Sequence, residues 1–467
     1  MTANAMAVSA HVLTDWNPED PAYWEQRGRR IANRNLAISV PALLLSFAVW
    51  TVWSVLVINL PAIGFNFGTD QLFWLASMPG LSGATLRIFY SFMVPIFGGR
   101  MWTTLSTASL LLPAIGIGFA VQNPDTPFMV FLILALLCGF GGGNFASSMC
   151  NISFFFPKHR QGYALGINAG LGNLGVSVAQ FVVPWIIFAG VFGAFGGEPQ
   201  HLVKGGVVRD VWIQNAGFIW VPFIALSTLA AWFGMNDISS ARASFADQAV
   251  IFKRKHNWIM CWLYTGTFGS FIGYSAGFPL LAKTQFPEVD SIQFVFLGPL
   301  IGAISRTLAG PLSDRVGGGR VTLAVFLTMT AAVLGVLYFL GIKDQAGAFW
   351  GFFAMFMVLF AASGVGNAST FQMIPVMFMK LRQRALEPKG VSQDQVRKES
   401  NKEAAAVIAF SSSVAAYGAF LIPRSYGISI EATGAPAAAL WVFIGFYVIC
   451  IALTWWYNTR PHAEVKC

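Results

Sequence analysis

The sequence has little charge for its length. Only 10% of its 467 residues are Asp, Glu, Lys or Arg, whereas soluble domains use about 25%. This shortage excludes a soluble globule. A disordered chain is excluded as well, because 43 Phe and 16 Trp require a buried environment. With 56% hydrophobic residues, the composition predicts an all-α polytopic membrane protein.

Residues that could carry cofactor or acid–base chemistry are scarce in the apolar segments. The five cysteines show neither CxxC nor metal-ligand spacing, which argues against a disulfide framework and an iron–sulfur cluster. All five histidines lie outside the apolar runs, so bis-histidine haem ligation is excluded. We therefore expect no metal and no cofactor. We also expect no enzyme activity, since an intramembrane hydrolase would need a buried base.

Twelve apolar runs are long enough to cross a bilayer, which takes about 20 residues each. They lie near 35–60, 71–96, 101–121, 127–150, 162–189, 211–234, 257–282, 291–312, 320–341, 348–379, 404–427 and 434–457. This spacing predicts two pseudo-symmetric six-helix bundles. Their division of the chain is an N-terminal segment 1–34, a bundle 35–234, a linker 235–256, a bundle 257–457 and a tail 458–467.

The positive charges are unevenly distributed among the loops. Most of the 29 Lys and Arg fall in the two terminal segments, the linker and the loops on the same side of the predicted spans. By the positive-inside rule this places both termini in the cytoplasm, and it explains the net charge of +9 without nucleic acid. The strongly charged stretch 380–403 is then a solvated cytoplasmic loop or surface helix in contact with anionic lipid.

Two arginines lie more than one helical turn from either end of a span, Arg87 in the second and Arg306 in the eighth, which are equivalent places in the two halves. Each costs at least about 2.5–3.5 kcal/mol in the membrane, and no Asp, Glu or His lies in a span to pair with it. The simplest partner is a small planar anion, which the guanidinium fork can bind in a bidentate manner. The alternative is that both arginines snorkel or cap backbone carbonyls.

The same lack of buried carboxylates and histidines bears on energy coupling. Proton-coupled carriers commonly use such residues as the relay. Two arginines without an anion would also repel each other, so the empty carrier should reorient poorly. Exchange of one anion for another is therefore favoured over proton symport, which remains the alternative.

A loop motif follows each buried arginine. After Arg306, residues 310–320 read G-x-x-x-D-R-x-G-x-x-R, and after Arg87 only the end of such a motif remains, at 98–100. The full copy resembles the loop signature of the major facilitator superfamily. We expect Asp314 in this motif to accept hydrogen bonds from nearby arginines or to lie at a helix N-terminus.

Further motifs extend the resemblance over nearly the whole chain. They are Leu81-Ser-Gly-Ala-Thr-Leu-Arg87, Gly143-Asn-Phe-Ala-Ser-Ser-Met149, Gly170-Leu-Gly-Asn-Leu-Gly-Val176, Thr267-Phe-Gly-Ser-Phe-Ile-Gly-Tyr-Ser-Ala-Gly277 and Gly302-Ala-Ile-Ser-Arg306. Together they resemble the nitrate/nitrite porter family, and within it the bacterial nitrate/nitrite antiporters. The resemblance implies a monomeric carrier in the bacterial inner membrane that exchanges nitrate for nitrite by alternating access, in nitrate assimilation. A nitrate/proton symporter is the alternative.

The resemblance also assigns substrate-binding residues. It places an anion clamp on Arg87 and Arg306 and an amide donor on Asn173. The matched pocket residues are Phe47, Phe145, Tyr264 and Phe268, and Ser412 is a hydrogen-bond donor in the eleventh span, where alanine stands at two places usually held by glycine. In the fifth span, Gly162, Gly166 and Gly170 recur every four residues, which predicts either close approach of a neighbouring helix or a substrate role.

Overall fold

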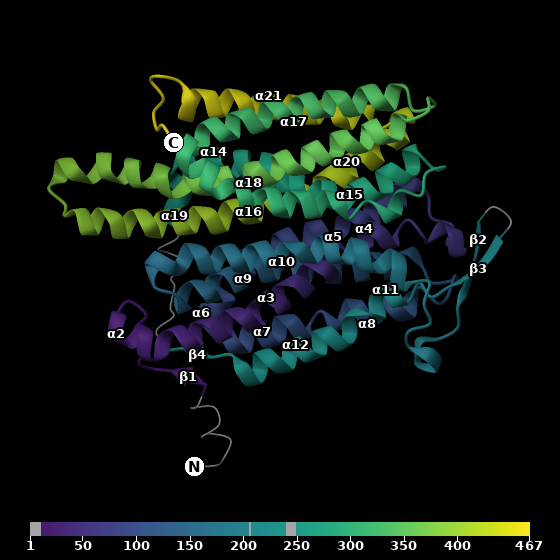
Figure 1. Cartoon of the computed structure of the whole chain (residues 1–467), viewed down its shortest axis with the longest axis horizontal. Coiled ribbons are helices and arrows are strands. Elements are labelled where there is room, and N and C mark those ends of the chain that lie inside the picture. The colour runs from purple at the N-terminus through teal and green to yellow at the C-terminus, as the bar shows by residue number, and fades with distance from the viewer. Residues whose placement is uncertain (1–10, 205–206, 240–248) are drawn as a thin grey trace, which may run out of the picture. The chain divides into compact units, whose positions relative to one another are not determined.

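A computed structural model describes residues 11–204, 207–239 and 249–467, and over these residues the chain is almost entirely helical (Figure 1). Contacts between residues divide it into two compact units. The first contains the described residues of 1–68 and 78–243, and the second contains 69–77 and the described residues of 244–467.

The first unit is a bundle of helices with two short strand pairs. Its helices are α2 (Pro21–Tyr23), α3 (Arg29–Thr51), α4 (Trp53–Leu56), most of α5 (Thr69–Tyr90), α6 (Met93–Phe97), α7 (Gly99–Ala108), α8 (Leu111–Ala120), α9 (Phe128–Phe155), α10 (Lys158–Ile186), α11 (Asn215–Phe218) and α12 (Trp220–Gly234). Strands β2 (Gln200–Lys204) and β3 (Val207–Val211) form an antiparallel hairpin. Strands β1 (Val12–Leu13) and β4 (Asp237–Ile238) pair in parallel.

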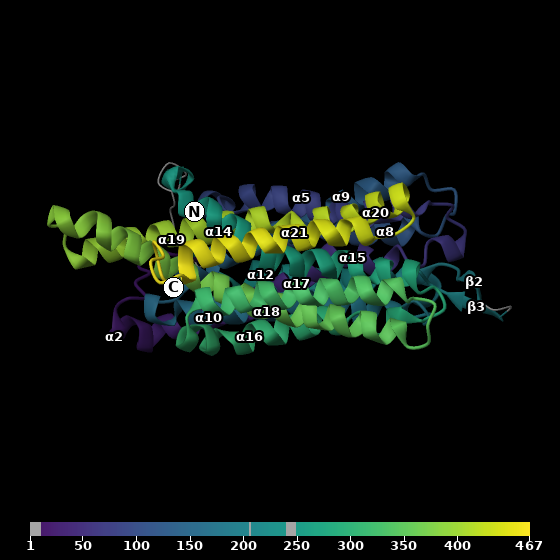
Figure 2. The same cartoon turned by 90° about the horizontal axis from the view of Figure 1, so that it is seen from above.

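The second unit is a helical bundle as well. Its helices are α14 (Lys255–Tyr264), α15 (Ser270–Gln285), α16 (Leu297–Val316), α17 (Gly318–Gly341), α18 (Ala348–Leu386), α19 (Gln393–Ala416), α20 (Gly418–Thr433) and α21 (Ala437–Thr454). A π-helical turn, Thr265–Gly269, joins α14 to α15. Helix α18 packs against both α16 and α17 (Figures 1 and 2).

The predicted all-α membrane fold is confirmed. Ten helical segments among the described residues are long and apolar enough to cross a membrane, and they coincide with ten of the predicted spans. The other two predicted spans are also helical. One is α5, which is less apolar because it carries Gln71 and Arg87, and the other is the seventh span, which the π-helical turn interrupts.

Close helix packing in the fifth span does not involve two of the three predicted glycines, Gly162 and Gly166. A Cβ on Gly162 or Gly166 would meet no atom within 4 Å, so close approach at these two positions is a wrong prediction. The contact lies further along α10, where a Cβ on Gly175 would come within 2.0 Å of the carbonyl oxygen of Leu44 in α3. The face of α10 that packs on α3 is set by helical periodicity, and Gly166 lies off that face.

The loop-motif aspartate also lies elsewhere than predicted. Asp314 is exposed in the last turn of α16, and it forms no ion pair with any described residue. In the first unit, a different aspartate, Asp237, has the role that was predicted for Asp314. The Asp237 carboxylate accepts the backbone N–H of Arg100 at the start of α7 (2.8 Å) and lies 3.6 Å from the Arg100 Nε. A Cβ on Gly98 would collide with Asp237.

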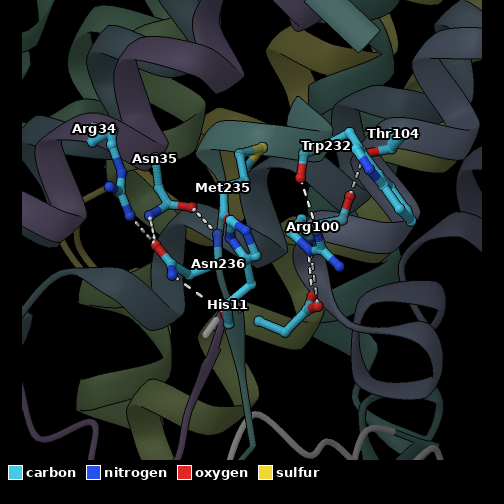
Figure 3. A network of polar contacts seen from close by, with 9 residues as sticks. His11, Arg34, Asn35, Arg100, Thr104, Trp232, Met235 and Asn236 are labelled. Atoms are coloured by element: carbon cyan, nitrogen blue, oxygen red, sulfur yellow. Dashed lines mark hydrogen bonds and ion pairs between the residues drawn. The ribbon is translucent and has the colours of Figure 1, made fainter. Parts of the chain in front are cut away.

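This aspartate belongs to a polar network that ties the N-terminal segment to the end of α12 (Figure 3). Arg100 donates to the carbonyl of Trp232 at 2.7 Å. Nearby, the Asn236 side chain accepts hydrogen bonds from Arg34 (2.6 Å) and Asn35 (3.1 Å). The network fixes the start of α7 and the adjacent strand β4 in one arrangement.

The charged stretch 380–403 is a helical hairpin and not simply a solvated loop. Helix α18 has 39 residues, or about 58 Å at 1.5 Å per residue, which exceeds the hydrocarbon core of about 30 Å. The chain returns through a short 3-10 turn into α19. Glu403 in this hairpin is only 6% exposed and pairs with Arg254 and Arg382.

Candidate functional site

In the first unit, Arg87 lies in α5 and is fully buried. Its Nε donates a hydrogen bond to the carbonyl oxygen of Gly142 in α9, at 3.0 Å. The guanidinium carbon lies 4.8 Å from the ring centroid of Phe145 and 5.4 Å from that of Trp50. Ring faces at these distances stabilise a cation without neutralising it.

Phe47 completes this aromatic wall. Its ring centroid lies 6.0 Å from that of Phe145 and 5.5 Å from that of Trp50. The Trp50 indole N–H donates to the carbonyl of Pro79 at 2.6 Å, which fixes the indole against α5. The structure therefore brings together Arg87, Phe145 and Phe47, all three predicted, and adds Trp50, which sequence reasoning missed.

Glycines explain how α5 and α9 come close enough for this arrangement. A Cβ on Gly83, one helical turn before Arg87, would lie 3.1 Å from the Cα of Gly142 and 2.6 Å from the Trp50 Nε1. A Cβ on Gly142 would lie 2.8 Å from the Cα of Gly83. Residues four apart share a helix face. The backbone contact at Gly83 therefore places the next residue on that face, Arg87, against α9.

Asn173 lies on α10 and is only 1% exposed. Neither atom of its side-chain amide has a hydrogen-bond partner among the described residues. Because buried amides are almost always hydrogen-bonded, this group is equipped to bind a ligand that offers acceptors. Gly175, two residues on, holds α10 against Phe47, since a Cβ there would lie 2.9 Å from the Phe47 Cβ.

In the second unit, Arg306 lies in α16 and is partly buried. Its guanidinium carbon lies 5.7 Å from the ring centroid of Phe371 in α18, and its buried Nη1 has no hydrogen-bond partner among the described residues. The Phe371 ring lies 5.8 Å from that of Tyr264, which stacks on Phe268 at 5.5 Å and 15°. The predicted residues Tyr264 and Phe268 are thus linked to Arg306 through Phe371.

The backbone contact before Arg306 repeats that of the first unit. Gly302 stands one turn before Arg306, and a Cβ on Gly364 of α18 would lie 2.2 Å from the Gly302 carbonyl oxygen. A Cβ on Gly302 would strike the ring of Phe271 at 2.6 Å. The two arginines therefore occupy equivalent local settings, each after a Gly-Ala pair on a helix that touches a glycine of a neighbouring helix.

A sequence signal for the missed residues exists. Gly141-Gly-Gly-Asn144 in the fourth span and Gly364-Val-Gly-Asn367 in the tenth share the pattern Gly-x-Gly-Asn. This internal repeat pairs α18 with α9, whose Phe145 contacts Arg87. The position that corresponds to Phe145 is Ala368, so the repeat locates the equivalent segment of α18, and the aromatic residue Phe371 lies one turn further on.

Phe268 lies in the π-helical turn, a type of irregularity often found at functional sites. Its neighbour Gly269 packs closely on α19, because a Cβ there would lie 2.8 Å from the carbonyl oxygen of Ala415. The helices therefore approach each other although the eleventh span carries alanine at the two places. Gly269 of the seventh span and Gly418 of the eleventh permit the contact, since a Cβ on Gly418 would lie 2.2 Å from the Gly269 carbonyl oxygen.

The structure gives Ser412 a local role. It is buried in α19, and its hydroxyl donates to the carbonyl of Ala409 in the same helix at 2.9 Å. Such bonds to the preceding turn are common for serines in helices. The substrate role of Ser412 stays a prediction.

Comparisons with known proteins show the family of the chain. Residues 42–387 match the family model of the Major Facilitator Superfamily. The chain is 54% identical over 450 residues to the nitrate/nitrite transporter NarU of Escherichia coli (strain K12), with 96% of each chain covered. It is 44% identical over 464 residues to the "Probable nitrate/nitrite antiporter NarK2" of Thermus thermophilus, with 97% of this chain and 98% of that relative covered.

Proposed function

The chain belongs to the Major Facilitator Superfamily, and from this premise we propose that it exchanges nitrate for nitrite across a membrane by alternating access. Relatives named as nitrate/nitrite transporters share 44–54% identity with it over nearly its full length. The observation that carries the proposal is the pair of arginines, one in each half of the sequence, each set against aromatic rings.

Arg87 and Arg306 are the proposed anion-binding groups. A guanidinium stays charged and offers a flat fork of N–H donors, which matches a flat oxyanion such as nitrate or nitrite. At about 4 Å and an effective dielectric near 20, each arginine attracts a monovalent anion by about 4 kcal/mol before desolvation. Asn173 supplies an amide donor, and the rings of Phe145 and Phe268 provide flat apolar walls.

Exchange is the proposed coupling mode. The predicted spans hold no histidine or acidic residue that could pass a proton. The buried carboxylate of Glu403 is held by Arg254 and Arg382 at the end of the second unit. An empty carrier would keep two mutually repelling cations, so an anion has to be bound for efficient reorientation. Nitrate/proton symport is the alternative that this reasoning disfavours.

The test is nitrate flux into proteoliposomes of the purified protein, either preloaded with nitrite or left empty, with the pH gradient varied independently. The proposal predicts uptake that requires internal nitrite and ignores the pH gradient. Uptake into empty vesicles driven by a proton gradient would establish symport instead. No nitrate flux under any condition, from protein shown to be folded, would overturn the assignment of substrate.

The cellular setting follows from the same reasoning. The positive charges in the terminal segments and linker support a bacterial inner-membrane location with both termini in the cytoplasm. The bundles 35–234 and 257–457 are the proposed halves of a monomeric carrier that serves nitrate assimilation. No catalytic step is assigned to it.

A further inference from the structure

At one end of the second unit lies a cavity of about 320 Å³. It is lined by the end of the 3-10 helix Ala249–Lys253, the start of α14, the last turns of α18 and one residue of α19. Its volume is within the range of about 300–1,000 Å³ that is typical of organic-ligand sites. None of the residues proposed to bind nitrate lines it.

The lining is strongly basic. Lys253, Arg254, Lys255 and Arg382 contribute four positive charges, and Glu403 contributes the one negative charge. That carboxylate is shared by Arg382 and Arg254, the latter at 3.2 Å. Lys253 forms no ion pair with any described residue. The lining therefore carries an excess of positive charge that its own carboxylate does not balance.

Two polar atoms in this lining lack partners. The Nδ1 of His256 and the Nε of Arg254 are buried, and neither has a hydrogen-bond partner among the described residues. His256 as a whole is only 3% exposed, and its Nε2 lies 3.3 Å from Glu464. Buried nitrogens left unbonded at a cavity are uncommon. The Arg254 Nε–H can only donate, so it indicates a ligand that supplies an oxygen acceptor.

A further ion pair lies at the edge of the cavity. Glu464 accepts from the Lys255 Nζ at 2.5 Å, which neutralises that lysine but leaves Lys253 and Arg254 facing one carboxylate. Phe378 and Leu381 give the cavity an apolar side. Both belong to the turns of α18 at the predicted end of the tenth span. Basic pockets between membrane helices at the cytoplasmic side are suited to phosphate headgroups.

We propose that this cavity binds the phosphate group of an anionic ligand, supplied by a phospholipid headgroup or by a soluble phosphate compound. Arg254 and Lys253 supply the charge, and the unpartnered Nε–H of Arg254 supplies a directed hydrogen bond. The site is separate from the proposed nitrate-binding residues, so its occupancy and nitrate exchange can be measured independently.

The test uses the purified full chain in a non-ionic detergent and two probes, inorganic phosphate and short-chain phosphatidylglycerol. Zwitterionic phosphatidylcholine, whose phosphate is balanced by its own ammonium group, is the comparison of zero net charge. Binding is measured by calorimetry for the wild type and for the double variant Lys253→Gln/Arg254→Gln. The matched control is Arg397→Gln/Lys398→Gln, which removes the same charge from exposed positions on α19. We expect saturable binding that weakens at least tenfold in the cavity variant and by less than twofold in the control.

The two probes separate the sources. Saturable binding of phosphate and phosphatidylglycerol alike shows that the phosphate group suffices, whereas binding of phosphatidylglycerol alone identifies a lipid headgroup. Equal loss in both double variants would overturn the proposal, because it would show diffuse surface charge. Failure of both probes to show saturable binding would overturn it as well. Nitrate exchange by the cavity variant reports its folding. If that variant does not fold, the exposed single change Lys253→Gln should still weaken binding about threefold.

Discussion

The Nε of Arg87 donates a hydrogen bond of 3.0 Å to the carbonyl oxygen of Gly142. This bond is possible because α5 and α9 touch at Gly83 and Gly142, where neither helix has a side chain. The carbonyl orients the buried guanidinium and offers it a partial negative charge, but it does not neutralise the cation. The glycine contact and the hydrogen bond thus orient the guanidinium together, and the cation retains its attraction for anions.

Replacing Asn173 with alanine should weaken nitrate affinity. Its amide is buried and has no hydrogen-bond partner among the described residues, so the proposed partner is the substrate. Loss of one hydrogen bond to an anion should cost about 1–2 kcal/mol, or roughly a tenfold rise in the apparent dissociation constant. Titration of nitrate into the purified variant measures this.

The control for that experiment is Asn168→Ala on the same helix. The Asn168 amide donates to the Ser148 hydroxyl at 2.8 Å, so its removal should lower stability and leave nitrate affinity unchanged. An unchanged affinity in the Asn173 variant would make Asn173 a packing residue.

Gly175→Ala should destabilise the first unit, and Gly166→Ala should not. The new methyl group at 175 would lie 2.0 Å from the Leu44 carbonyl oxygen, whereas the methyl group at 166 would meet nothing within 4 Å. Overpacking costs about 1–3 kcal/mol, while alanine in an open helical position is favoured over glycine by up to about 1 kcal/mol. Thermal unfolding in detergent should therefore give opposite shifts for the two variants.

Asp237→Asn should lower the free energy of unfolding. Arg100 is 6% exposed, and the Asp237 carboxylate is the acid that pairs with it among the described residues. The amide keeps the shape but leaves the buried cation without a counter-charge, at a cost of about 1–3 kcal/mol. The matched change Asp314→Asn, at the exposed and unpaired aspartate of the loop motif, should alter stability by less than about 0.5 kcal/mol. The reverse order in denaturant titrations would contradict the assignment.

The C-terminal tail, residues 458–467, should detach as the pH falls. Burial lowers the pKa of His256 below its usual 6.5, although its contact with Glu464 acts in the opposite direction. Burial raises the pKa of Glu464, but the hydrogen bonds from Lys255 and His256 outweigh it, so this pKa lies below the usual 4.5. In both cases the unfolded state binds more protons, so stability is complete above pH 6.5 and declines as the pH falls through the folded-state values.

The measurement is the unfolding temperature between pH 4 and pH 8. It should fall below pH 6.5 in the wild type, and His256→Gln should flatten the upper part of that decline. His462→Gln, at an exposed position in the same tail, should leave the profile as it is. A wild-type profile that is flat from pH 8 to pH 5 would contradict this account of the tail.

The membrane fold, the two arginines and some of the aromatic residues around them could be predicted from the sequence. Long apolar runs locate membrane helices because the bilayer sets their length, and charge inside such a run is expensive, which singled out Arg87 and Arg306. Phe145 could be chosen among 43 Phe only because it lies in a motif that resembles a known family.

The remaining features depend on tertiary contacts. Trp50 and Phe371 were missed because helices that are apolar all round give no indication of which face meets a neighbouring helix. The Asp237–Arg100 pair joins residues 137 positions apart, beyond the reach of local pattern. Gly166 was assigned to a contact from spacing alone, and spacing identifies a helix face without saying what that face meets.

Nitrate binding to Arg87→Lys and Arg306→Lys tests the central claim most directly. Lysine keeps the charge but loses the bidentate fork, and each charged hydrogen bond lost costs about 1.5–3 kcal/mol. Calorimetric titration of the purified variants should show affinity at least about tenfold weaker in both, with nitrate–nitrite exchange reduced in parallel. Arg315→Lys, at an exposed position on the same helix as Arg306, should bind nitrate as the wild type does. Near-normal affinity and exchange in both arginine variants would contradict the account.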